Sequence, residues 1–199
     1  MIRALALLAL AAVPASAQSA AEIPGRMALA WETFQTECRQ ALMAPEAFLQ
    51  ATPPQTPAGQ AAVATSPDGQ VLFANRFAND QIVEVRVFGL PEMRVIHCTV
   101  RDNGFNAATI DVSIAQDPAP WVDAFETVVQ PAAPRPFVGG QVPIAFAYKG
   151  MQGEWIGQVE GVMRTYATAL DWDGETVFAN ATIGPMTIAI GAVRQQVAE

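Results

Sequence analysis

The first strong hydrophobic pattern of the chain has the spacing of a helix. Between residues 26 and 43, large apolar side chains recur every three or four positions and form a single stripe. The stripe consists of Met27, Trp31, Phe34, Cys38 and Leu42. We therefore predict an amphipathic helix that buries Cys38, followed after Pro45 by a short further helical turn.

The apolar positions change to a period of two at Gln70, which indicates β-strands. Turn residues at 79–80 and 89–92 divide the segment 70–101 into three strands, and short turns favour antiparallel neighbours. The segment before them, residues 52–69, is rich in proline and glycine and is typical of a flexible surface loop. The pattern predicts an antiparallel meander that follows a loop.

Alternation in the third of these strands places neighbouring side chains on opposite faces. Cys98 shares an apolar face with Ile96 and Val100, whereas His97 points to the other face. His97 and Cys98 therefore cannot converge on one ligand without a bulge. The same alternation makes Cys98 a core position of the sheet.

The second half of the chain begins with a segment whose period is ambiguous. Residues 108–116 alternate as a strand does, although the sequence is also compatible with the start of a helix; we expect a strand. A helix is expected from about Pro118 to Gln130, because proline is tolerated in a first helical turn and an apolar stripe follows. Strand-like segments come after it, at residues 142–148, 155–170, 175–183 and 186–193.

These elements predict an α+β fold. We expect a mostly antiparallel sheet of six or seven strands, with the N-terminal helix packed on it and the second helix between two β-regions. A mature chain of residues 18–199 is long enough for a single domain with a substantial core. The composition is that of a folded protein, because 51% of the residues are hydrophobic and only 15% are charged.

The N-terminal segment, residues 1–17, has the organisation of a secretory signal peptide. Arg3 precedes ten apolar residues and a small-residue triplet ends the segment, so that cleavage is expected between Ala17 and Gln18. The apolar run is about half of the roughly 20 residues that a membrane-spanning helix needs. We therefore expect a protein that is exported to the periplasm, or secreted, and that does not span a membrane.

Cys38 and Cys98 are the only cysteines. An even number of cysteines in an exported protein most often means a disulfide, and both patterns described above place the thiol on a buried face. The bond would close a loop of 61 residues, counting 38 and 98, and would tether the N-terminal helix to the sheet. Redox, haem and zinc chemistry are disfavoured, because the sequence has no C-x-x-C or C-x-x-C-H motif and no second histidine.

The chain is acidic, with a formal net charge of −8 that becomes −9 when Arg3 leaves with the signal peptide. Lys149 is the only lysine. Binding to nucleic acid or to an anionic lipid surface needs clustered cations. The charge therefore argues against a nucleic-acid partner.

Residue types that commonly carry catalysis are few. His97 is the only histidine, no serine lies in a G-x-S-x-G motif, and no phosphate-binding glycine loop is present. The densest group of carboxylates is Asp171, Asp173 and Glu175 around Gly174, which suits either hard oxygen ligation of Ca²⁺ or an acidic turn between two strands. The acidic turn is the favoured interpretation, and we assign no catalytic residue and no cofactor.

Two octapeptides of the chain resemble each other. Residues 68–75 and 173–180 share five of eight positions at an offset of 105, and each begins with Asp-Gly before alternating residues. A duplicated β-unit would explain the match, and so would common turn chemistry before a strand. The sequence leaves both explanations open.

Two functions follow from these observations. The first is a non-catalytic module that binds a protein, a peptide or a component of the cell envelope, because the standard catalytic groupings are missing from a chain well suited to folding. The second is a hydrolase that uses carboxylates, with or without Ca²⁺. A deep cleft with converging carboxylates would favour the hydrolase, and an exposed patch would favour the binding module.

Overall fold

The described part of the protein begins just before its first helix. The computed structural model describes residues 22–78, 81–89, 92–102, 119–129, 138–149, 155–184 and 187–197. The predicted signal peptide with its cleavage site and the ambiguous segment 108–116 lie outside these ranges. Within them, no helix is both long and apolar enough to cross a membrane.

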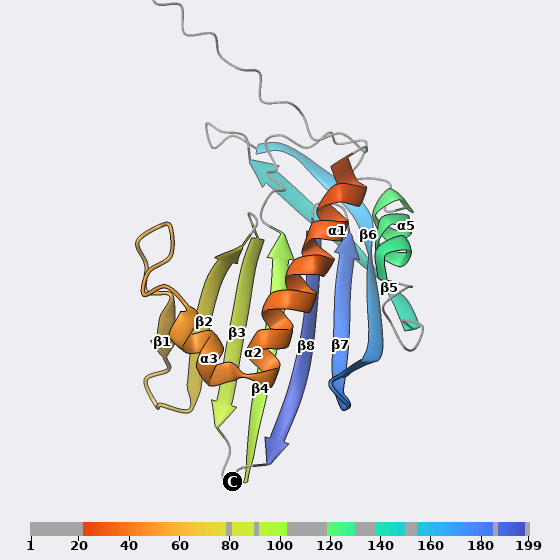
Figure 1. Ribbon diagram of the computed structural model, residues 1–199. Helices are drawn as coiled ribbons and strands as arrows, with labels where there is room; N and C mark the ends of the chain where they lie inside the picture. Colours follow the sequence, from red (N-terminus) through yellow and green to blue (C-terminus); the bar gives the residue numbers. More distant parts are fainter. Residues whose placement is uncertain are drawn as a thin grey trace, which may run out of the picture.

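An almost continuous helical segment opens the fold (Figure 1). It consists of α1 (Ile23–Thr33), the π-helical turn η2 (Phe34–Cys38) and α2 (Arg39–Met43), and α3 (Pro45–Ala51) follows. All five residues of the predicted stripe are buried, which confirms the helix and its core face. The mean spacing of the five stripe residues exceeds the 3.6 residues of an α-helical turn. The π-helical turn, which is wider, therefore helps to keep their side chains on one face of the helix.

The strands form one antiparallel sheet in the order β1-β2-β3-β4-β8-β7-β6-β5. The first four are β1 (Val63–Thr65), β2 (Val71–Ala78), β3 (Gln81–Gly89) and β4 (Met93–Asp102). The last four are β5 (Val138–Lys149), β6 (Trp155–Trp172), β7 (Glu175–Gly184) and β8 (Thr187–Val197). β4 and β8 pair along most of their length, and this pairing joins two meanders into one sheet.

The predicted number of six or seven strands is wrong, because the sheet has eight. The strand that the sequence did not reveal is β1, which lies inside the segment 52–69. It has only three residues, all exposed, so no alternation of buried and exposed positions marks it. The α+β class, the meander of β2, β3 and β4, and the second helix, α5 (Ala119–Val129), are confirmed.

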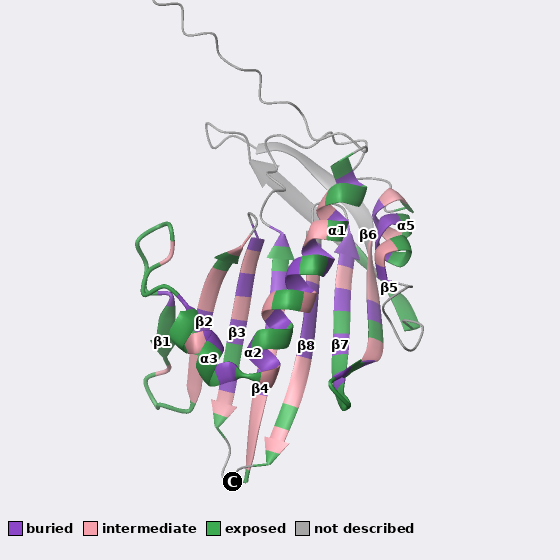
Figure 2. Cartoon of the chain, viewed as in Figure 1, coloured by how far each residue is buried: buried purple, intermediate pink, exposed green. Residues whose placement is uncertain are grey.

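The helices pack against one face of the sheet (Figure 1). α1, η2 and α2 contact β4, α1 and η2 also contact β8, and α5 contacts both α1 and β7. Buried positions alternate along the strands (Figure 2), and these side chains meet the helices in a single core. In the part of the core below α5, the rings of Phe125 and Tyr166 lie 4.8 Å apart between centroids.

The two halves of the chain repeat the same order of elements, a helix followed by a four-stranded meander. α5 starts at residue 119 and α1 at residue 23, an offset of 96; β8 starts at residue 187 and β4 at residue 93, an offset of 94. Because β4 and β8 are antiparallel neighbours at the centre, an approximate two-fold axis normal to the sheet relates the strand orders of the two meanders.

The similar octapeptides do not belong to this repeat. Residues 68–75 lead into β2 and residues 173–180 lead into β7, whereas the strand equivalent to β2 is β6. Their offset of 105 also differs from the offset of 84 between the first residues of β2 (71) and β6 (155). Shared turn chemistry before a strand therefore accounts for their resemblance.

Candidate functional site

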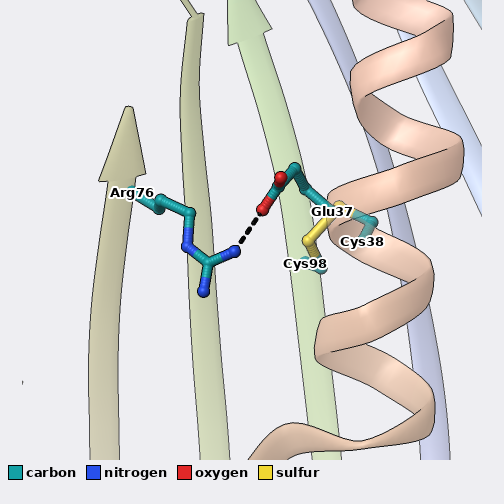
Figure 3. The surroundings of a disulfide bond; sticks show 4 residues. All are labelled: Glu37, Cys38, Arg76 and Cys98. Atoms are coloured by element: carbon teal, nitrogen blue, oxygen red, sulfur yellow. Dashed lines mark hydrogen bonds and ion pairs between the residues drawn. A yellow bond between two sulfur atoms is a disulfide. The ribbon is translucent and has the colours of Figure 1, made fainter. Parts of the chain in front are cut away.

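Cys38 and Cys98 form the predicted disulfide, which ties the end of η2 to β4 (Figure 3). The sulfur atoms are 1.99 Å apart, the Cα atoms are 5.4 Å apart, and both residues are fully buried. Beside the bond, Arg76 of β2 donates hydrogen bonds to Glu37 Oε2 at 2.6 Å and to the carbonyl oxygen of Phe48 at 3.0 Å. The cysteines thus fasten the helical layer to the sheet, and neither is a free thiol.

The carboxylates considered for Ca²⁺ are each engaged in a separate structural contact. Asp173 and Gly174 form the tight turn between β6 and β7, with φ values of 57° and 81° that suit a two-residue hairpin turn. The contacts are Asp171 Oδ1 with the amide of Gly174 at 2.9 Å, Asp173 with Arg39 at 2.5 Å, and Glu175 with Arg194 at 2.5 Å. Among the described residues, no three Asp, Glu, His or Cys side chains are grouped to hold a metal ion.

The face of the sheet opposite the helices carries most of the exposed large apolar side chains, and we call it the open face. Strand register places one row of residues across it, in the order Phe73, Arg86, His97, Val193 and Phe178. Phe73 is 37% exposed and Phe178 is 69% exposed. One phenylalanine therefore lies on each side of the group formed by Arg86, His97 and Val193.

Further apolar groups extend the open face beside this row. Phe77 of β2 is 41% exposed and lies opposite Ile82 of β3, while Phe88 of β3 lies opposite Val95 of β4. These side chains alternate with the buried residues that face the helices, so they belong to the open face. Together with Phe73 they form an apolar surface over β2, β3 and β4.

The charged groups of the open face are concentrated on β3 and β4. Glu84 Oε2 and Arg101 Nε form an ion pair at 3.0 Å. Arg86 lies over the ring of Phe73, with its Cζ atom 5.9 Å from the ring centroid, a cation–π contact. Arg86 has no ion pair with any carboxylate of the described ranges. The arginines that do have one are Arg26, Arg39, Arg76, Arg94, Arg101 and Arg194.

His97 lies at the centre of the open face, between Arg86 of β3 and Val193 of β8. Partial burial lowers the pKa of its imidazole below the ordinary value of 6.5. The positive charges of Arg86 and Arg101 lower this pKa further, and the carboxylate of Glu84 opposes them. The imidazole is therefore neutral at pH 7, and the nearby cationic charge comes from arginine.

We expect the stability of the protein to fall as the pH decreases below about 6.5. In that range the unfolded chain binds a proton at His97 more readily than the folded chain does, so protonation favours unfolding. The measurement is the free energy of urea unfolding between pH 5 and 8 for the wild type and for His97→Gln. Because His97 is the only histidine, the difference between the two curves isolates its contribution, and parallel curves would contradict the lowered pKa.

The alternation of apolar residues does not by itself indicate that the open face is uncovered. In β2, Val71 and Phe73 point to the open face and Leu72 and Ala74 to the helices, so apolar residues occupy both sides. Antiparallel sheets with one solvated face usually alternate apolar and polar residues. The large apolar residues on both faces of β2 were the one signal in this strand that a solvent-exposed face carries apolar groups. The alternation does not encode which of the two faces the helices cover.

Comparison of the chain with protein-family models, with curated proteins and with solved structures found no match. The functional argument therefore depends on the geometry of the molecule.

Proposed function

We propose that this protein is a non-catalytic interaction module that works in the periplasm, with the open face as its binding surface. The observation that carries the proposal is the exposure of three phenylalanine side chains on a sheet face that no described helix covers: Phe73, Phe77 and Phe178, at 37, 41 and 69%. Phe73 and Phe77 belong to the apolar surface over β2, β3 and β4, and an exposed apolar patch of this kind commonly marks an interaction site.

The kind of ligand follows from the shape of a sheet face. Small-molecule sites are concave and enclose most of the ligand, whereas the exposed phenylalanines stand on the outer surface of a sheet. Aromatic residues and arginine are the residues most enriched where proteins bind each other. Phe73 under Arg86 provides both, which supports a protein or peptide partner.

Export supports the same proposal. A buried disulfide fits an oxidising compartment, and the N-terminal segment reads as a signal peptide with cleavage before Gln18. A calcium-dependent hydrolase has less support, because the calcium candidates Asp171, Asp173 and Glu175 are held in a turn and in two ion pairs.

The test is site-specific photo-crosslinking in the cells that produce the protein. A photoreactive phenylalanine analogue replaces Phe178 on the open face or Glu32, an exposed residue on α1, as the matched control. We expect covalent protein adducts from position 178, few from position 32, and recovery of the chain from the periplasmic fraction starting at Gln18. Equal adducts from both positions, or none from position 178, would remove the open face as the binding surface.

A further inference from the structure

The arrangement of charges on β3 points to one occupant of the open face. Glu84 and Arg86 are two residues apart on this strand, so both side chains leave the open face about 7 Å from each other. Glu84 already binds Arg101 with one oxygen, and a carboxylate has room for a second guanidinium. Arg86 has no carboxylate partner among the described residues.

We propose that the open face binds the open face of a second copy of this chain, in a two-fold symmetric dimer of stacked sheets. The inference rests on the proposed function, in that the open face is an interaction surface, and it names the partner. Homodimers with two-fold symmetry bury the same patch on both subunits, and two sheet faces pack about 10 Å apart with their strands close to aligned.

Two-fold symmetry satisfies the charges on both sides at once. The two-fold axis lies in the plane between the two sheets, perpendicular to β3 and level with Val85. It places the β3 strands of the two copies directly over each other in antiparallel directions. Glu84 of one copy then faces Arg86 of the other, and the reverse pair forms by symmetry. Arg86 of each copy thereby gains a carboxylate partner, which the other copy of the same chain supplies.

The charge of the whole molecule favours this face over any other for self-association. The formal net charge is −8, so two copies repel each other over most of their surfaces. On the central strands β3, β4 and β8, the described charged residues of the open face are two arginines and one glutamate. The open face is thus a surface where two acidic chains can approach without strong repulsion.

Aromatic rings add the apolar contact that a stable dimer needs. Phe73 and Phe178 flank the charged centre at opposite ends of one row, on β2 and β7. Stacking two sheets removes both rings from water in each copy, and buried aromatic side chains surrounding charged pairs are typical of interface centres. The charged pairs set the register, and the rings supply the buried apolar area.

The experiment measures the molar mass of the purified mature protein by sedimentation equilibrium, at concentrations up to about 100 μM. We expect twice the mass of one chain. Arg86→Glu should weaken the dimer about tenfold or more, because Glu84 would then face a like charge. Glu84→Arg should do the same, and the double exchange Glu84→Arg with Arg86→Glu should restore dimerisation. Glu32→Arg makes the same change of charge on α1 and should leave the dimer intact.

The outcomes separate this inference from the proposed function. A monomer at every concentration overturns the dimer, and if residue 178 still forms adducts with another protein, the interaction surface stands with a different partner. A dimer that both Arg86→Glu and Glu84→Arg leave unchanged shows that the copies meet elsewhere and overturns the inference. Circular dichroism of each variant verifies that it is folded.

Discussion

Replacement of both cysteines by alanine, Cys38→Ala with Cys98→Ala, is expected to lower the free energy of unfolding by about 4 kcal/mol. The bond joins residues 60 positions apart in the sequence, and a long closed loop restricts the unfolded chain strongly. Since small domains are stable by about 5–15 kcal/mol, this variant should lose much of its stability. The measurement is urea unfolding followed by tryptophan fluorescence.

The wild type in the presence of a reductant provides the control for the cysteine variant. Both cysteines are fully buried, so reduction should follow unfolding, and the reduced wild type should then have the same midpoint as the variant. A loss of less than about 1 kcal/mol in the variant would contradict the role of the bond as the main fastening of helix to sheet.

Phe34→Ala is the second change with a large expected effect, a loss of about 3–5 kcal/mol. Phe34 is fully buried in η2, with its ring centroid 5.3 Å from that of Trp31 and 5.4 Å from that of Trp172. Truncation removes a ring that connects the N-terminal helix with β6, and the cavity left behind adds to the cost. Urea unfolding at a fixed protein concentration measures the loss.

Phe178→Ala is the matched control, because the same truncation is made on the open face. The side chain is 69% exposed, so the stability of the single chain should change by no more than about 0.5 kcal/mol. Equal losses for the two variants, at a protein concentration low enough for the chain to be monomeric, would mean that Phe178 is buried within the single chain, and the assignment of the open face would then be wrong.

Local periodicity was enough to find most of the elements. The stripe from Met27 to Leu42 predicted the helix, and it did so across a π-helical turn because the residues still fall on one face. Alternation around Cys98 predicted which side of β4 is buried. Among the described strands, β1 alone was missed, because its three residues are all exposed and show no alternation of buried and exposed positions.

The disulfide could be predicted because its two halves are local features. Each cysteine lies on an apolar face that the surrounding residues define, and two cysteines allow a single pairing. The calcium candidates show the opposite case. Asp171, Asp173 and Glu175 are close in sequence, but their carboxylates point to different partners, and the arginines that bind two of them come from α2 and β8.

For the part of the chain that the structure describes, the sequence by itself determined the helices, every strand except β1, and the bond between Cys38 and Cys98, and it also determined the acidic character of the protein. Each of these depends on neighbouring residues or on composition. Only the tertiary structure decided that β4 pairs with β8 and that all described helices cover the same face of the sheet. These choices depend on contacts between distant segments, which a periodic pattern does not encode. They leave Phe73, Arg86 and Phe178 exposed together, and our functional proposals depend on that exposure.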